Sequence, residues 1–208
     1  MIELIDNTTT NKYNLTEVVA FLKTKEAFGG LSNMAAKLYP IYVNDTIIDN
    51  TEILYQICRY PENPEIQNQI LSNKSPMGAK MVSKKYRKEY TRSDFENVKV
   101  DIMYWCLRVK LACNPLNFGS LLDSTGNKLI VEISRNDPFW GAQFSKDNSE
   151  FLIGQNILGK LLMELRSYYR LNKGKTTILK VEPLEIENFK LLGNSIGVVV
   201  NNVLNNNN

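Results

Sequence analysis

The chain has 208 residues, of which 43% are hydrophobic and 23% charged, and its formal net charge is +3. This length allows one domain with a substantial core, and no apolar run approaches the roughly 20 residues that span a bilayer, so we expect a soluble protein without a membrane partner. The N-terminus is acidic where a secretory signal would be basic and then apolar, which favours a cytoplasmic location.

The complete absence of histidine narrows the chemistry more than any other feature of the composition. It excludes Ser-His-Asp triads, Cys-His pairs and histidine-based zinc sites. The three cysteines, Cys58, Cys106 and Cys113, form no C-x-x-C pair, so we expect reduced thiols rather than disulfides or a zinc site. Catalysis must then use carboxylates, lysine, tyrosine or a bound ion, and we expect neither a metal nor a cofactor.

In the first half of the chain, the sequence predicts strands at 19–22, 39–43 and 46–48, and helices at 51–59 and 75–87. The second and third strands flank Asn44-Asp45, a typical hairpin turn. Asn50 or Thr51 caps the first helix, and Ser75 followed by Pro76 begins the second. Residues 1–18 are polar and irregular, and we treat them as an N-terminal extension.

In the second half, the sequence predicts helices at 94–111, 115–122 and 156–169, and strands at 128–133, 176–181 and 196–200. The helix at 156–169 has one continuous apolar stripe, which we expect in the core. No linker interrupts residues 19–170, which we take as the catalytic domain. Residues 171–208 form a C-terminal appendage, whose Asn-rich end at 205–208 we expect to be disordered.

Two predicted helices carry candidate catalytic side chains near their N-termini. Glu52 lies in the first turn of its helix, with Gln56 on the same face, and could activate water or stabilise an oxocarbenium-like centre. Lys80 lies about one turn inside the next helix and could serve as a nucleophile or a phosphate ligand. A capping role for Glu52 and a solvated basic face around Lys80 remain open alternatives.

Two loops carry candidate binding residues. Residues 134–141 combine an acid, Asp137, with Phe139 and Trp140, a mixture that suits stacking on a base while the carboxylate binds ribose or water. Structural loop packing is the alternative. Gly154 with Asn156 offers a close-approach turn at a helix start, which could hold an anion.

Six segments, in order, resemble the NADAR family: GGLSN at 29–33, TEILYQ at 51–56, SP with AK at 75–80, VK with M, LR and K at 98–110, ND with FWG at 136–141, and GQNILG with LLM and R at 154–166. The corresponding family motifs are G-x-L-S-N-F, S-E-H-x-Y-Q, S-P-x-x-A-[KR], V-K-x-x-V-M-x-x-A-L-R-x-K, D-x-[FY]-W-G and G-x-N-x-L-G-x-x-L-M-x-x-R. Together they cover about residues 19–170, and their number, order and spacing make the resemblance specific.

The resemblance implies an α+β fold, a compact and mainly helical single domain with a small β component. It also implies N-glycosidic hydrolysis of ribose-based substrates. Family activities include cleavage of a riboflavin-pathway ribosylamino intermediate and removal of ADP-ribose from modified guanine in nucleic acid. We therefore expect an N-glycosidase whose partner is an ADP-ribose-containing or ribosylated small molecule, an NAD-derived metabolite, or ADP-ribosylated DNA or RNA.

By position, the resemblance implies that Glu52 is the catalytic glutamate, assisted by Lys80 and Asp137, while Trp140 stacks on the base. The remaining predicted substrate-binding residues are Gly30, Ser32, Asn33, Gln56, Gly154 and Asn156. One departure stands beside the glutamate, where the family histidine is Ile53. It supports the alternative of a non-catalytic module that binds ADP-ribose or NAD. A third reading, nucleic-acid binding, rests on the basic face at Lys80, Lys84, Arg87 and Lys88.

Overall fold

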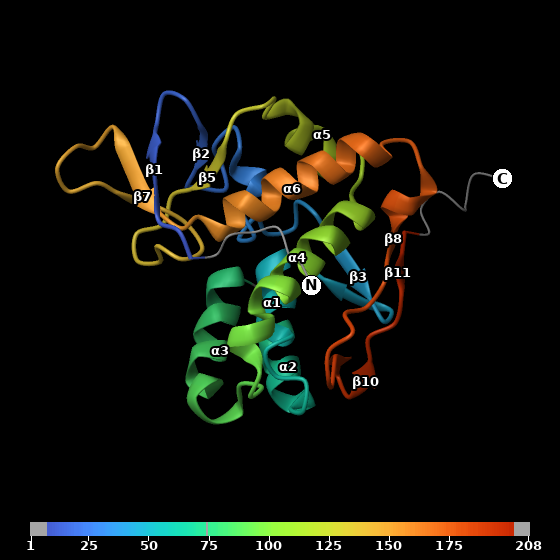
Figure 1. Cartoon of the computed structure of the whole chain (residues 1–208). Helices are drawn as coiled ribbons and strands as arrows, with labels where there is room; N and C mark the ends of the chain where they lie inside the picture. Colours follow the sequence, from blue (N-terminus) through green and yellow to red (C-terminus); the bar gives the residue numbers. More distant parts are fainter. Residues whose placement is uncertain (1–7, 74, 202–208) are drawn as a thin grey trace. The chain divides into compact units, whose positions relative to one another are not determined.

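The computed structural model of the chain describes residues 8–73 and 75–201 (Figure 1). Its contacts divide the chain into two compact units. Unit 1 comprises Met1–Ser32 and Leu116–Lys173, and unit 2 comprises Asn33–Pro115 and Gly174–Asn208. Both contain helices and short strands, so the predicted α+β class is confirmed. In the part of the chain that the structure describes, no helix has both the length and the apolar character needed to cross a membrane.

Unit 1 contains two small sheets. The predicted strands at 19–22 and 128–133 are confirmed as β2 (Val19–Phe21) and β5 (Ile130–Glu132), which pair in parallel. A second sheet was not predicted; it has the antiparallel order β1-β7-β6, formed by β1 (Asn11–Asn14), β7 (Phe151–Gly154) and β6 (Gln143–Phe144). A core cluster lies between these strands and contains Tyr13, Val131, Ala142 and Leu152.

Two helices and a short 3-10 turn complete unit 1: α5 (Asn117–Ser124), α6 (Ile157–Asn172) and η1 (Gly29–Leu31). Helix α6 packs on β5 and α5 with its predicted apolar stripe buried. Gly159 allows this close approach, because a Cβ there would lie 2.1 Å from the Ile130 carbonyl oxygen. The buried Arg166 joins α6 to the turn before β5, since its guanidinium donates to Thr125 Oγ1 and to the Lys128 carbonyl.

Unit 2 begins with the predicted hairpin of β3 (Ile41–Val43) and β4 (Thr46–Ile48). Asn44 and Asp45 both have positive φ, as a two-residue hairpin turn requires. Four helices follow: α1 (Thr51–Ile57), α2 (Pro64–Leu71), α3 (Pro76–Tyr90) and α4 (Phe95–Cys113). Helix α2 was not predicted; it begins at Pro64, a position in the first turn where the missing N–H of proline removes no helical hydrogen bond.

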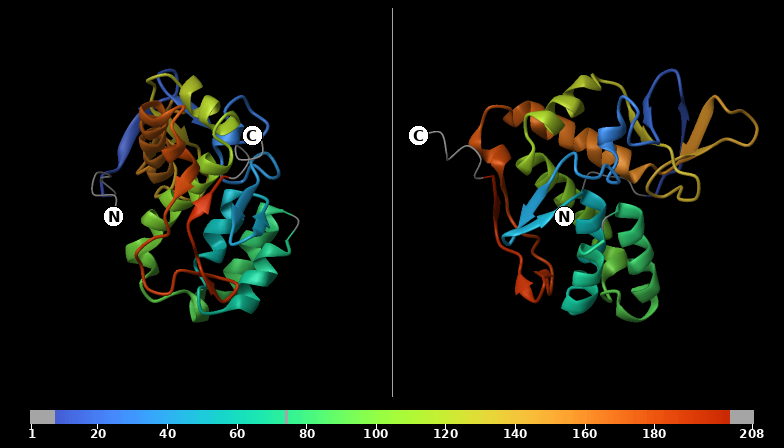
Figure 2. Two further views of the ribbon diagram at one scale, coloured as in Figure 1. Left: turned by 90° about the vertical axis from the view of Figure 1, so that its right-hand side faces the viewer. Right: turned by 180° about the vertical axis from the view of Figure 1, so that it is seen from behind.

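Within unit 2, α1 and α3 lie side by side, as Figures 1 and 2 show from three directions. Asn50 caps α1 by accepting a hydrogen bond from the Ile53 amide, and Ser75 caps α3 by accepting one from the Gly78 amide. Local sequence therefore sets where each helix begins. Tertiary packing sets which of their faces meet, and this packing places the candidate catalytic residues.

The C-terminal segment packs on α4 of unit 2. Trp105 of α4 donates to the Glu182 carbonyl at 3.0 Å and packs edge-on against Phe189. The strand prediction for 176–181 was wrong over its first four residues, where Thr176–Leu179 forms a 3-10 helix, η2. Short strands follow, β8 (Lys180–Val181), β9 (Lys190–Leu191), β10 (Asn194–Ser195) and β11 (Val199–Val200). The predicted disordered end at 205–208 lies outside the described residues.

Candidate active site

The predicted site residues fall into two groups, one in each unit. Unit 2 holds Asn33, Glu52, Gln56 and Lys80, whereas unit 1 holds Gly30, Ser32, Asp137, Trp140, Gly154 and Asn156. In unit 2, the backbone amide of Glu52 donates to the Asn33 carbonyl at 3.1 Å, which joins the segment before the hairpin to the first turn of α1. Residues far apart in the sequence therefore meet around Glu52.

Two side chains contact the same oxygen of the Glu52 carboxylate. The Gln56 amide, one turn later on α1, donates to Oε1 at 2.9 Å, and Lys80 Nζ of α3 lies 3.7 Å from Oε1. The other oxygen, Oε2, receives no hydrogen bond from the described residues. The Glu52 side chain is only 8% exposed, while that of Lys80 is 47% exposed. The carboxylate is thus held in place, and the ammonium group has room to move.

Asn33 brings an unpaired acceptor to the same part of unit 2. Its side chain is buried, and Nδ2 donates to Met103 Sδ of α4 at 3.0 Å. Among the described residues, Oδ1 has no hydrogen-bond partner. A buried amide oxygen without a partner is costly, because it loses its hydrogen bonds to water and gains none in return. Such an atom suits a ligand that donates a hydroxyl hydrogen.

The Tyr55 phenol and the Cys106 thiol near Glu52 are held in their neutral forms. Burial raises the pKa of the Tyr55 phenol far above its usual value; the positive charge of Arg59 lowers this pKa, and the negative charge of Glu52 raises it. Burial, together with a hydrogen bond to Cys58, raises the pKa of the Cys106 thiol. All three cysteines are free, and Cys58 and Cys106 are buried. Neither a tyrosinate nor a thiolate nucleophile is therefore expected beside Glu52.

In unit 1, the Asp137 carboxylate organises its own loop. Its Oδ1 accepts hydrogen bonds from the amides of Phe139 at 3.1 Å and Trp140 at 3.0 Å. The rings of Phe139 and Trp140 meet edge-on, with their centroids 5.0 Å apart. Both of these hydrogen bonds use Oδ1. The second oxygen, Oδ2, can therefore contact a substrate while Oδ1 maintains the loop.

Four further predicted residues of unit 1 are buried. The Asn156 side chain bridges to β5, because Nδ2 donates to the Ile130 carbonyl at 2.8 Å and Oδ1 accepts from the Glu132 amide at 3.1 Å. Gly154 packs so closely that a Cβ there would lie 2.3 Å from the Gly141 carbonyl oxygen. Gly30 and Ser32 lie in and just after η1. Packing within unit 1 thus accounts for the contacts of Gly154 and Asn156 described here.

Comparison with known proteins decides the family. A family model described as the NADAR domain matches residues 20–170. The chain belongs to the NADAR family. The motifs at 29–33, 51–56, 75–80, 98–110, 136–141 and 154–166 lie inside the matched region, so the inferred resemblance is confirmed.

Curated relatives and one solved structure agree with this NADAR assignment. The chain is 30% identical to N-glycosidase YbiA of Escherichia coli over 75% of its own length and 91% of that protein. It is 32% identical to the chloroplastic riboflavin biosynthesis protein PYRR of maize over 73% of its length, but spans only 25% of that relative. It also resembles the NMR structure of E. coli YbiA, with a TM-score of 0.63 and 29% identity over 75% of this chain and 86% of that one.

The departure from the NADAR motif at Ile53 does not affect the contacts of Glu52. Ile53 is 1% exposed and belongs to the hydrophobic core. The Glu52 carboxylate instead contacts the side chains of Gln56 and Lys80. The isoleucine therefore fills a core position, and the carboxylate is held by other residues.

Two buried polar residues that the sequence did not single out join this NADAR site. Ser83 Oγ donates to Gln56 Oε1 at 2.5 Å, and the Tyr60 hydroxyl contacts Ser83 Oγ at 2.9 Å. The available signal was helical spacing, because Ser83 follows Lys80 by three residues and so shares its face of α3. A lone serine in a basic helix gave no chemical reason to select it.

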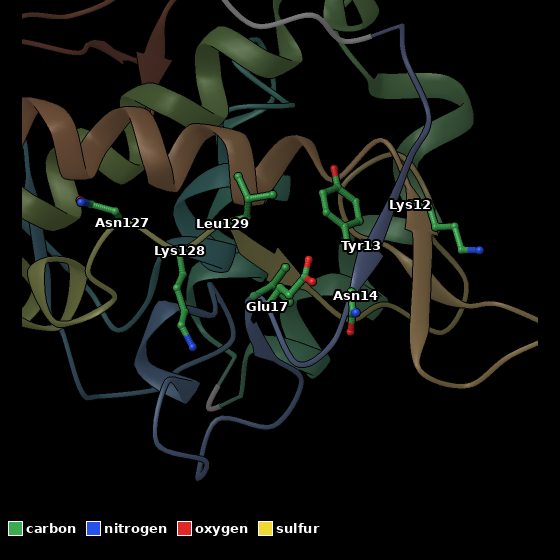
Figure 3. A pocket seen from close by; sticks show the side chains of 8 residues that line it. Lys12, Tyr13, Asn14, Glu17, Asn127, Lys128 and Leu129 are labelled. Carbon is green, nitrogen blue, oxygen red and sulfur yellow. The ribbon is translucent and has the colours of Figure 1, made fainter.

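Unit 1 of the NADAR chain also has an open hollow of about 490 Å³, shown in Figure 3. None of the predicted site residues lines it; its lining is Lys12, Tyr13, Asn14, Glu17, Val18, Asn127, Lys128 and Leu129. In Figure 3 the Lys12 and Lys128 side chains point away from one another. Asn14 Oδ1 already accepts from the amide and hydroxyl of Thr16. The polar groups of this hollow do not converge on a ligand.

Proposed function

We propose that this chain is a hydrolase of N-glycosidic bonds in ribose-containing substrates and that Glu52 is its catalytic carboxylate. The arrangement of Glu52 carries the proposal. One oxygen is held by Gln56 and paired with Lys80, and the other receives no hydrogen bond from the described residues, although the side chain is almost fully buried. A carboxylate fixed on one side and available on the other can act on a bound sugar.

Such a carboxylate matches the charge that develops when an N-glycosidic bond breaks. The electron pair of the C1–N bond leaves with the base, and positive charge spreads over ribose C1 and the ring oxygen. Glu52 stabilises this charge and accepts a proton from the water whose oxygen bonds to C1. This proton then passes to the departing base, which returns Glu52 to its carboxylate form. The products are the free base and a ribose with a hydroxyl at C1.

Lys80 and Asn33 supply the other groups that a ribose substrate needs. Lys80 is half exposed and can move from Glu52 to an anionic group of the substrate or to the opened sugar. The unpaired Asn33 Oδ1 can accept a hydrogen bond from a ribose hydroxyl, which would satisfy this buried atom only in the complex. In unit 1, we assign Trp140 to stacking on the base. Asp137 lies in the same loop, and we assign its carboxylate to contacting the substrate.

For the substrate itself, we propose ADP-ribose attached to guanine in nucleic acid, or a related ribosylamino or NAD-derived metabolite. The names of the relatives, N-glycosidase and riboflavin biosynthesis protein, support the reaction type and the second substrate class. The alternative, a module that binds ADP-ribose or NAD without cleaving it, rests on the histidine replaced by Ile53. The burial of Ile53 in the core weakens that alternative, because Gln56 and Lys80 hold the Glu52 carboxylate although no histidine stands at position 53.

The test is mass-spectrometric detection of cleavage products. The purified protein is incubated separately with ADP-ribosylated guanine oligonucleotides, NAD and a ribosylamino-pyrimidine phosphate. We expect release of the base from one of them and a loss of at least about 100-fold in Glu52→Gln. Glu65→Gln is the matched control, since Glu65 holds the same place in the first turn of α2 but is exposed. Full activity of Glu52→Gln, or tight binding without any product, would contradict the proposal.

A further inference from the structure

A continuous chain of buried hydrogen bonds ends on the Glu52 carboxylate. Starting farthest from it, the Tyr60 hydroxyl donates to the Ser83 carbonyl at 2.6 Å and lies 2.9 Å from Ser83 Oγ. Ser83 Oγ donates to Gln56 Oε1 at 2.5 Å, and Gln56 Nε2 donates to Glu52 Oε1 at 2.9 Å. Tyr60, Ser83, Gln56 and Glu52 are all buried, so water does not compete freely for these groups.

The direction of every proton in this chain follows from simple chemistry. An amide oxygen cannot donate, so the hydroxyl hydrogen of Ser83 must point to Gln56 Oε1. That hydroxyl has no second hydrogen for Tyr60, and the one hydrogen of the Tyr60 phenol is donated to the Ser83 carbonyl at 2.6 Å, so it can at most be shared with Ser83 Oγ. With Oε1 of Gln56 occupied in this way, Nε2 is the end of the amide that faces Glu52. Ser83 and Gln56 therefore both donate toward the carboxylate, while Tyr60 holds Ser83 in place through its carbonyl.

The two ends of a glutamine side-chain amide have nearly the same shape but opposite hydrogen-bonding roles. Turned over, the Gln56 amide would place its oxygen against a Glu52 oxygen, and two acceptors repel. Two contacts select one orientation of the Gln56 amide. Glu52 accepts from Nε2, and Ser83 donates to Oε1, the end farther from Glu52. Loss of the Ser83 hydroxyl would remove the donor that selects the productive orientation.

We propose that Ser83 and Tyr60 are positioning residues for the hydrolysis, which lock the Gln56 amide so that it always donates to Glu52 Oε1. This donation keeps Oε1 occupied and leaves Oε2 as the oxygen that meets the substrate. The catalytic consequence rests on the proposed function, whereas the locking of the amide does not. Ser83 and Tyr60 themselves touch neither substrate nor water in this scheme.

The locking is tested by the proton chemical shifts of the Gln56 side-chain NH2 group, whose signals are identified by their loss in Gln56→Leu. In the unmodified protein, we expect the proton donated to the carboxylate to have a chemical shift clearly different from that of the other NH2 proton. Ser83→Ala should reduce this separation, because the amide then samples both orientations, and Ser83→Thr, which keeps the hydroxyl, should restore it. Tyr60→Phe should change it in the same direction as Ser83→Ala. Unchanged Gln56 signals in Ser83→Ala in a folded protein would overturn the proposal.

The catalytic consequence is tested by steady-state kinetics on whichever of the three candidate substrates the protein cleaves. Ser83→Ala should lower kcat by about tenfold with little change in KM, and Ser83→Thr should recover most of the loss. The control is Ser72→Ala, because Ser72 is an exposed helix-end serine whose hydroxyl donates only to the Asn68 carbonyl. Unchanged kcat in Ser83→Ala would refute the positioning role. If no substrate is turned over by any variant, the proposed function fails while the NMR signals still decide the locking.

Discussion

Lys80 Nζ lies 3.7 Å from the same Glu52 oxygen that accepts the Gln56 amide. The neutral Gln56 amide and the Lys80 ammonium group therefore contact the same oxygen of the carboxylate and leave its second oxygen to a ligand. The two members of the ion pair differ in exposure, since Glu52 is almost buried and Lys80 is half exposed. This asymmetry suggests that stability and activity respond differently when each residue is replaced.

Lys80→Met should lower kcat/KM by about tenfold or more and leave the free energy of unfolding nearly unchanged. The reason is that an ion pair with a half-exposed member contributes only about 0–1 kcal/mol to stability, whereas a charge that contacts the substrate is needed for the reaction. Lys84→Met is the matched control, because Lys84 lies one turn later on α3 and is exposed. Enzyme kinetics and urea unfolding of both variants check this. Equal losses in the two variants would indicate a general effect of the basic face.

Asp137 can be tested by separating its charge from its hydrogen bonds. Asp137→Ala removes the acceptor of the Phe139 and Trp140 amides and should destabilise unit 1 by about 1–2 kcal/mol. Asp137→Asn keeps an oxygen acceptor and should cost less. If the carboxylate also contacts the substrate, the asparagine variant will lose activity despite its better stability. An active Asp137→Asn protein would restrict Asp137 to organising its loop.

Lys110 should make the stability of the protein depend on pH. Its side chain is buried in α4, and burial lowers its pKa to about 7. An unfolded lysine has a pKa of about 10.4, so between these values the unfolded chain binds the extra proton. Stability should therefore rise from pH 7 toward pH 10, with a slope of up to about 1.4 kcal/mol per pH unit, and be lost again as the pH falls to about 7.

Urea unfolding at several pH values from 7 to 9.5 measures this dependence. Lys110→Met has a side chain of similar length but no titrating amine. The rise of its unfolding free energy with pH should therefore be less steep than in the unmodified protein, by up to about 1.4 kcal/mol per pH unit. Identical pH profiles for the two proteins would show that Lys110 is charged in both folded and unfolded states or neutral in both.

Gly159→Ala should destabilise the protein by about 3 kcal/mol or more, because the added methyl group would collide with the Ile130 carbonyl oxygen of β5. Backbone cannot move away as easily as a flexible side chain. Gly197→Ala is the control, since a Cβ at exposed Gly197 would meet only the Asn44 side chain at 3.8 Å, an ordinary contact. Thermal or urea unfolding of both variants measures the difference, and a stable Gly159→Ala protein would contradict the close packing of α6 on β5.

The helices show how far local sequence reaches. Helix α1 begins after Asn50, one of the two caps expected for it, α3 begins after Ser75 as expected, and α6 buries most of the stripe that its 3.6-residue spacing predicted. These features depend on residues within a few positions of one another. By contrast, the segment 176–179 has the composition of a strand but forms a 3-10 helix. Its conformation depends on packing against α4, which its own residues do not encode.

The candidate site shows the same division. Sequence by itself determined the family, the absence of imidazole chemistry and the choice of Glu52 and Lys80, because each rests on residue identity and order. Only tertiary structure decided that Gln56 and Ser83, 27 positions apart, share a buried hydrogen bond, and that Asn33 has an unpaired oxygen. A polar side chain acquires such a role from the groups that folding brings next to it, and these neighbours lie far away in the sequence.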